Sequence, residues 1–374
     1  MMLENGKISI GDFRIMVIIF SIGSSVILAP SILASTAKQD GWIAYFLSIL
    51  IGLGFLFVYN RLASLYPDLS FVEYSQAILG KWLGRLTSIL FLIYVFLVCN
   101  SLLREIGEFI TINVLVETPI QIIMIMFLLA SLIGVHLGLE VIGRTAVIFF
   151  PWIIGLFTLL FIFLIPEYDL INIQPVFEGG IKPILKGSYH TLAMPFLELA
   201  IFLMILPAVI KKEKVNKAFY SGAIIGGLVI FLLVLFSFIS LGPDTTDRQV
   251  YSTYLLGKKI SIGDFIERIE IIVAIIWFLS IYFKLTLCYY GLSLGLAQLF
   301  KLHHYQTLIF PLAILIISFS ILQYPNVVIF KQTLMKALVP YSLFICFIIP
   351  LLLLTVGKMK KQRDGSYASS SAGE

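Results

Sequence analysis

Ten long apolar runs dominate the pattern of hydrophobic and polar positions, and they predict ten transmembrane helices. A helix needs roughly 20 mostly apolar residues to cross the hydrocarbon core of a bilayer. The third and eighth runs exceed that length, which indicates tilted helices. The runs cover residues 12–36, 42–65, 86–112, 119–138, 144–166, 188–210, 218–241, 265–299, 306–323 and 336–356. The predicted fold is an all-α integral membrane protein with a single membrane domain, residues 1–374.

Two of these runs contain helix-breaking residues near mid-membrane. The first carries Gly23, Ser24 and Ser25, and the sixth carries Pro195 a few residues after Thr191. A bilayer core holds no water to pair with freed backbone groups, so a broken helix must be buried or line a cavity. Interrupted helices at matching positions in two halves of a chain are a sequence signal for a solute site. The pattern therefore predicts a small-solute site in the middle of the membrane.

The two interrupted runs each open one half of the chain. Spans one to five occupy residues 12–166, and spans six to ten occupy residues 188–356. Because five is an odd number, the second half enters the membrane from the opposite side. The sequence thus predicts a 5+5 inverted repeat, which rests on topology and on the position of the breaks, not on a residue-by-residue match.

The distribution of positive charge predicts the orientation. With a cytoplasmic N-terminus, span ends and loops on the inside hold fifteen Lys and Arg residues, against nine on the outside. The positive-inside rule therefore places both termini in the cytoplasm. The tail beyond about residue 359 ends in small polar residues, and we expect it to be disordered.

Composition excludes several other classes of protein. The chain is 60% hydrophobic and only 13% charged, whereas soluble domains are nearer a quarter charged. The three cysteines lie inside apolar spans, where we expect them to pack as small hydrophobic residues. We find no metal-ligand spacing, no phosphate-binding loop and no nucleophile–base arrangement, so we expect no metal, no cofactor and no enzymatic activity.

Span three carries a polar stripe. Tyr94, Ser101, Glu105 and Glu108 fall within about 60° of one another at helical spacing, and Arg104 can pair with Glu108 at i, i+4. An ionisable group inside a span usually faces the bundle interior. The stripe is either a structural ion-pair region or an outer gate that includes a proton-titrating carboxylate.

Spans six and eight each place one charged residue inside the membrane. Glu198 follows Pro195 by about one turn, where it could accept hydrogen bonds from the break or bind an ammonium group or a proton. Lys284 could pair with Glu198 or Glu105, or take the place of a sodium ion. Thr286 and Tyr290 lie on a different face of span eight, and the sequence leaves open which face lines the cavity. A purely structural ion pair is the alternative for both charged residues.

Several motifs, taken together in their order and spacing, resemble one known family. They are Ile8–Ser9–Ile10–Gly11–Asp12, Asp40–Gly41–Trp42, Tyr66–Pro67–Asp68–Leu69–Ser70–Phe71–Val72–Glu73–Tyr74, Ile78–Leu79–Gly80–Lys81–Trp82–Leu83–Gly84, Pro195–Phe196–Leu197–Glu198, and Leu206–Pro207 followed by the basic loop 211–217. From about residue 8 to 356 the chain resembles the B subunit of bacterial spore germinant receptors of the GerA type.

This resemblance implies a fold, partners and a location. It implies the amino acid–polyamine–organocation superfamily and its ten-helix fold of the LeuT type, with helices 1 and 6 interrupted. It also implies the spore inner membrane, assembly with receptor A and C subunits (a large membrane subunit and a lipoprotein), and recognition of a small germinant such as an amino acid, sugar or nucleoside. The Ser/Thr pair expected of a sodium site in span eight is missing, so we do not expect sodium coupling.

The expected site combines the two breaks with inward groups of spans three and eight. Its ligand-binding residues are Gly23, Ser24, Ser25, Tyr94, Ser101, Thr191, Pro195, Glu198, Lys284, Thr286 and Tyr290, and its gating or proton-binding residues are Glu105, Glu108, Glu198 and Lys284. Three functions share this fold: a ligand-sensing receptor subunit, an amino acid–proton symporter, and a conduit for water or ions.

Overall fold

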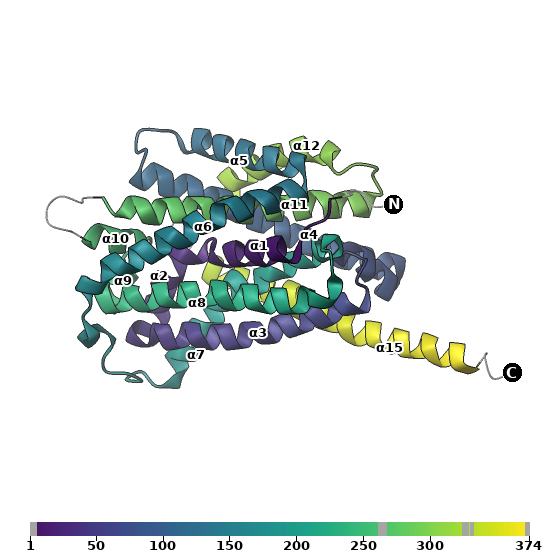
Figure 1. Ribbon diagram of the computed structural model, residues 1–374, viewed down its shortest axis with the longest axis horizontal. Helices are drawn as coiled ribbons and strands as arrows, with labels where there is room; N and C mark the ends of the chain where they lie inside the picture. Colours follow the sequence, from purple (N-terminus) through teal and green to yellow (C-terminus); the bar gives the residue numbers. More distant parts are fainter. Residues whose placement is uncertain (1–5, 261–267, 324–328, 330–332, 371–374) are drawn as a thin grey trace.

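The chain forms a bundle of helices that run mostly along the long axis of the molecule (Figure 1). The computed structural model describes residues 6–260, 268–323, 329 and 333–370. Its α-helices are α1 Ile10–Ile22, α2 Ser25–Ala37, α3 Gly41–Leu65, α4 Phe71–Asn113, α5 Ile120–Leu137, α6 Leu139–Leu164, α7 Ile181–Leu192, α8 Val215–Leu241, α9 Pro243–Arg248, α10 Ser252–Lys259, α11 Glu270–Phe300, α12 Gln306–Gln323, α14 Val339–Leu343 and α15 Ile349–Ser370.

Short helical turns of other geometry join these helices. The π-helical turns are η4 Ala193–Leu197, η8 Leu334–Leu338 and η9 Phe344–Ile348. The 3-10 turns are η1 Lys38–Asp40, η2 Ile165–Glu167, η3 Leu170–Ile173, η5 Glu198–Met204, η6 Leu206–Ala208 and η7 Lys212–Lys214.

Eight helices in the described part of the chain are long and apolar enough to cross a membrane. They correspond to the predicted spans other than the first and the sixth. Those two are the interrupted spans, and their first halves, α1 and α7, have only 13 and 12 residues. The all-helical membrane fold is therefore confirmed.

The surface of the bundle is apolar where a soluble protein would be polar. Large side chains such as Met126, Ile148 and Trp152 are 66–69% exposed on α5 and α6. Such exposed apolar side chains are unfavourable in water but favourable in contact with lipid.

The beginning of α1 and the end of α15 lie at the same end of the bundle, which we call the terminal end (Figure 1).

Capping residues define where two of the helices begin. At α1, Asp12 N–H donates to Ser9 Oγ and Ser9 N–H donates to Asp12 Oδ2, both at 3.1 Å. At α4, Ser70 N–H donates to Glu73 Oε2 at 2.9 Å in the same reciprocal arrangement. Such capping boxes satisfy backbone donors that the first turn leaves unpaired. Two of the motifs that carry the family resemblance therefore encode helix starts.

The predicted third span covers only the later part of a longer helix. The span is predicted over residues 86–112, and α4 extends from Phe71 to Asn113 with a bend at Gly80, whose φ is +81°. The glycine adopts a left-handed conformation that other residues disfavour, so one chain segment holds two helical parts at an angle. α15 continues to Ser370, residues 371–374 lie outside the described part, and the disorder of the tail stays a prediction. Lys, Met, Gln and Arg after residue 357 are good helix formers, which favours this extension.

Small residues let the central helices approach closely. A Cβ at Gly226 of α8 would lie 2.6 Å from Ser21 Cβ on α1. On α11, a Cβ at Gly291 would lie 2.8 Å from Ile201 Cδ1, and one at Gly295 would lie 2.5 Å from Leu92 Cδ2. Real Cβ atoms do not approach other atoms so closely, so these glycines set the helix spacing.

Gly52 and Gly54 of α3 offer a matched test of this packing. A Cβ at Gly52 would lie 2.3 Å from the Phe196 ring beside the sixth-span break, whereas one at Gly54 meets nothing within 4 Å. We expect Gly52→Ala to destabilise the protein by about 1–3 kcal/mol because it overpacks the interface. Gly54→Ala should leave stability within about 0.5 kcal/mol. Thermal unfolding of the two purified variants in one detergent tests the difference, and equal melting temperatures would contradict it.

Candidate functional site

The first-span break lies where the sequence predicts it. α1 ends at Ile22 and α2 begins at Ser25, and Gly23 between them has φ 14° and ψ −125°, outside the helical region. Gly23 N–H still donates to Ile19 O at 3.1 Å, which closes the last turn of α1. The backbone beyond this point leaves the helical path and presents Ser24 to the interior.

The sixth-span break is also confirmed. α7 ends at Leu192, and Met194 has φ −121° and ψ 117°, an extended conformation inside the π-helical turn η4. Pro195 follows within η4 and is buried. The chain resumes as the 3-10 turn η5, whose first residue is Glu198.

The two breaks meet each other and the middle of α11. Ser24 Oγ donates to Met194 Sδ at 3.3 Å, which joins the two unwound segments across 170 positions of sequence. Lys284 of α11 extends its ammonium group to the same place. Its Nζ lies 2.5 Å from Glu198 Oε2 and donates to Ser24 Oγ at 2.7 Å. We call this set of Ser24, Met194, Glu198 and Lys284 the break junction.

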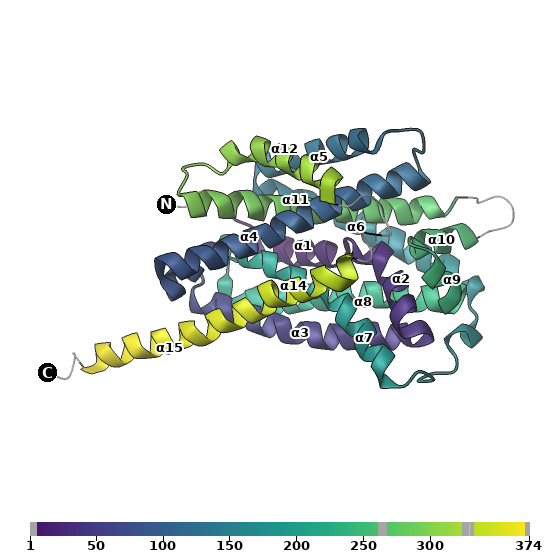
Figure 2. The ribbon, with the colours of Figure 1, turned by 180° about the vertical axis from the view of Figure 1, so that it is seen from behind.

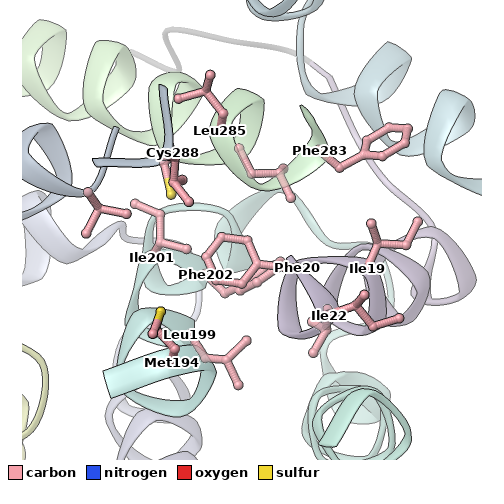
Figure 3. Packing of buried hydrophobic residues seen from close by; sticks show 14 of the residues in the cluster. Ile19, Phe20, Ile22, Met194, Leu199, Ile201, Phe202, Phe283, Leu285 and Cys288 are labelled. Carbon is pink, nitrogen blue, oxygen red and sulfur yellow. The ribbon is translucent and has the colours of Figure 1, made fainter. Parts of the chain in front are cut away.

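The break junction lies inside an apolar shell. The side chain of Lys284 is 0% exposed and that of Glu198 is 6% exposed. Lys284 Nζ lies 5.3 Å from the centroid of the Phe20 ring, which meets the Phe202 ring edge-on at 5.2 Å. Figure 3 shows these two rings between α1, the sixth span and α11. In such a low-dielectric setting the attraction between the two charges is far stronger than in water.

Lys284 fills the space beside the first break. A Cβ added at Gly23 would lie 2.4 Å from Lys284 Cδ and 2.9 Å from Phe20 O. Only a glycine therefore fits against the lysine side chain. Of the two carboxylates that the sequence offers to Lys284, the structure pairs it with Glu198, and which face of α11 lines a ligand cavity stays a prediction.

Thr286 and Tyr290 face other helices. Thr286 Oγ1 donates to Tyr282 O at 2.7 Å, and its Cγ2 lies against Gly134 of α5. The Tyr290 ring packs edge-on against Tyr305 at 5.6 Å. Lys284 and these two residues point in different directions because successive side chains on a helix are 100° apart. The structure does not bring Thr286 or Tyr290 to the break junction.

Other expected residues lie near the breaks but make separate contacts. Thr191 Oγ1 lies 2.7 Å from Ser48 Oγ of α3, a hydrogen bond that anchors α7 just before its break. Ser25 Oγ is buried and has no hydrogen-bond partner among the described residues. Tyr94 packs near Tyr341, with ring centroids 5.9 Å apart, and Ser101 Oγ donates to Leu97 O at 2.9 Å.

The acidic residues of α4 divide into two environments. Glu108 pairs with Arg104 at 2.9 Å, as the i, i+4 spacing predicts. Glu105 is 3% exposed, and its Oε1 has no hydrogen-bond partner among the described residues. Glu105 is thus a buried carboxyl group outside the Lys284–Glu198 ion pair but close enough to interact electrostatically with both of its members, and its gating role stays a prediction.

Contacts at both ends hold the interrupted helices in place. Thr253 Oγ1 of α10 donates to Val26 O, at the start of α2, at 2.6 Å. At the terminal end, Ile8 N–H donates to Ala208 O at 3.1 Å and Ile210 N–H donates to Ile8 O at 3.0 Å.

Sequence reasoning missed these contacts, because they depend on tertiary arrangement. It also missed Met194 and Phe20, for which proximity to the two breaks was an available signal.

Solved structures of transporters identify the fold of this protein. The transporter Mhp1 of the nucleobase-cation-symport-1 family, closed with bromovinylhydantoin bound, aligns with a TM-score of 0.64 over 91% of this chain and 78% of its own, at 12% identity. MhsT in complex with L-phenylalanine aligns with a TM-score of 0.60 over 92% and 97%, at 14% identity. The chain is therefore a membrane protein with a transporter fold of the LeuT type.

Sequence comparison gives the family. The family described as "Spore germination protein" matches residues 7–328. Spore germination protein KB of Bacillus subtilis (strain 168) is 30% identical over 96% of this chain and 97% of its own length. Spore germination protein YndE of the same strain is 27% identical over 97% and 100%. This chain belongs to the spore germination protein family.

Proposed function

We propose that this chain is the ligand-sensing membrane subunit of a spore germinant receptor. The germinant binds at the break junction and changes the balance between closed and open forms of the bundle. A ligand shifts such a balance only by its different affinity for the two forms. The observation that carries the proposal is the contact of Lys284 with both Glu198 and Ser24, because it ties three separate segments to one charged group.

The chemistry of the break junction favours a zwitterionic amino acid among small germinants. Lys284 offers an ammonium group and Glu198 offers a carboxylate, which are the complements of an amino acid's own carboxylate and ammonium groups. When the amino acid binds, two ion pairs replace the Lys284–Glu198 pair: the ligand carboxylate pairs with Lys284, and the ligand ammonium group pairs with Glu198. The exchange frees Lys284 from Ser24 and Glu198, and thereby loosens the contact between α11 and the two breaks.

The finer features of the fold belong to the same proposal. Ten spans in a 5+5 inverted repeat account for the eight long helices plus the two interrupted spans. Family membership supports residence in the spore inner membrane, assembly with receptor A and C subunits, and no enzymatic activity. The count of Lys and Arg residues supports cytoplasmic termini.

An amino acid–proton symporter is the second candidate. The likeness to transporter structures favours it, and Glu198, Glu105 and Lys284 are buried ionisable groups that a proton could use. A sensor and a symporter differ in whether solute crosses the membrane.

Binding and uptake assays on the same preparation separate the two functions. The purified chain is screened with radiolabelled amino acids for saturable binding, and proteoliposomes are then tested for accumulation driven by a proton gradient. Binding without accumulation is expected for a sensor, whereas gradient-driven accumulation would establish the symporter. Absence of binding by both the chain alone and the complex with its A and C subunits would overturn the proposed site.

We expect amino acid binding to be independent of sodium. The Lys284 ammonium already supplies a fixed positive charge at the junction, so a second cation there would be repelled. Binding affinity should agree within about twofold between buffers of sodium chloride and choline chloride at equal ionic strength. An increase in affinity that saturates with sodium concentration would show that a sodium site exists.

A further inference from the structure

A groove between α4, α11 and α12 lies on the outside of the bundle, away from the break junction. Its volume is about 850 Å³, and its thirteen lining residues are apolar except for Arg85 and Lys301. The three helices contact one another, and α4 crosses α11 at an angle in Figure 2. Ile89, Ile93 and Leu315 line the groove and are 42–47% exposed, so it opens toward the lipid.

The two cations mark one end of this groove. Arg85 lies near the start of the membrane-crossing part of α4, and Lys301 follows the end of α11. Among the described residues neither forms an ion pair with a carboxylate, and Arg85 Nε is buried without a hydrogen-bond partner. Two positive groups therefore share one end of an apolar groove with no described anion to balance them.

The depth of the groove matches one leaflet. Trp82 is 83% exposed three residues before Arg85, and exposed tryptophan is typical of the membrane–water interface. The lining residues of α4 extend from Arg85 to Phe96, which is about 16 Å at 1.5 Å per residue. That is roughly half of the ~30 Å hydrocarbon core. A partner's transmembrane helix would need contact across both leaflets, whereas the groove ends near mid-membrane.

We propose that this groove binds an anionic phospholipid of the leaflet at the terminal end. Its phosphodiester group contacts Arg85 and Lys301, and one acyl chain lies along the apolar wall formed by α4, α11 and α12. The guanidinium group of Arg85 suits bidentate contact with phosphate oxygens. Because α11 carries Lys284, the lipid would contact the same helix that holds the break junction, from about two turns beyond Lys284 onward.

The test measures retention of two lipids by the purified full-length chain. Phosphatidylglycerol or phosphatidylcholine is added in detergent, and native mass spectrometry and thermal unfolding record the number of bound lipids and the melting temperature. We expect phosphatidylglycerol to be retained at about one copy per chain and to raise the melting temperature more than phosphatidylcholine does. Each basic residue near the bilayer surface contributes about 1 kcal/mol to attraction of anionic lipid, so loss of both cations should weaken retention roughly 30-fold.

Matched variants distinguish lipid binding in the groove from general attraction of an anionic lipid to basic residues. Arg85→Gln with Lys301→Gln should lose selective retention, and Leu315→Trp should reduce it by filling the groove while keeping both charges. Arg61→Gln with Lys217→Gln removes two exposed cations at the terminal end outside the groove and should leave retention unchanged. Equal retention of the two lipids by wild type, or equal loss in the control, would overturn the proposal. So would loss of receptor-subunit copurification in the groove variants with lipid retention intact, since a partner would then be the occupant.

Discussion

Lys284→Met is expected to cost about 3–5 kcal/mol of stability, the largest effect of any substitution considered. It leaves the Glu198 carboxylate buried without its cation, and breaking a buried ion pair at one partner is far more costly than removing both. Glu198→Gln should cost less, because the Lys284 ammonium keeps its hydrogen bond to Ser24 Oγ and its position over the Phe20 ring. The double variant should recover most of the loss, since no buried charge then remains unpaired.

Thermal unfolding of the four purified proteins in one detergent measures these differences as a double-mutant cycle. Arg144→Met is the matched control, because it breaks an ion pair with Glu140 whose side chains are 72% and 44% exposed. Exposed pairs are worth about 0.2–1 kcal/mol, so this control should change stability little. Additive effects of Lys284→Met and Glu198→Gln would show that the two groups do not stabilise one another, and would contradict the assigned pair.

Gly23→Ala is expected to raise the germinant concentration needed for half-maximal germination at least tenfold. The added Cβ would lie 2.4 Å from Lys284 Cδ, so the lysine must move away from the first break. Ser24 and Glu198 would then lose their shared contact with the ammonium group. Dose–response curves of spores carrying the variant, at matched protein level, measure the effect.

Gly54→Ala is the control for this substitution, because the same methyl group there meets nothing within 4 Å. It should give the wild-type dose–response curve. If Gly23→Ala spores at normal protein level also give that curve, the first break has no role in sensing the germinant. A loss of response caused only by low protein level would instead assign Gly23 to folding.

Local chemistry explains why the two breaks could be predicted from sequence. Gly23 and Pro195 disturb a helix through their own backbone properties, whatever surrounds them. The Ser9–Asp12 and Ser70–Glu73 caps also act over three residues, but both stretches were used only as family motifs, so the helical part before Gly80 was left out of the predicted third span. Local signals therefore predicted both breaks, and an unused local signal accounts for the helical part that was left out.

Tertiary packing determines which face of α11 meets the two breaks, and the sequence alone does not reveal it. The helical period separates Lys284 from Thr286 and Tyr290, but only the rotation of α11 determines which face meets the breaks. That rotation follows from contacts such as Gly291 against Ile201, which lie 90 residues apart in the chain. For the same reason, neither Met194 in the break junction nor Phe20 beside it was predicted as a site residue.

Binding of a radiolabelled amino acid to the Lys284→Met/Glu198→Gln double variant tests the central claim most directly. The amino acid used is the one that binds the wild-type protein most tightly in the screen. The double variant is expected to remain folded and to lose saturable binding by at least a hundredfold, because both complementary charges are gone. Wild-type affinity in a folded double variant would show that the ion pair at the break junction does not recognise the germinant.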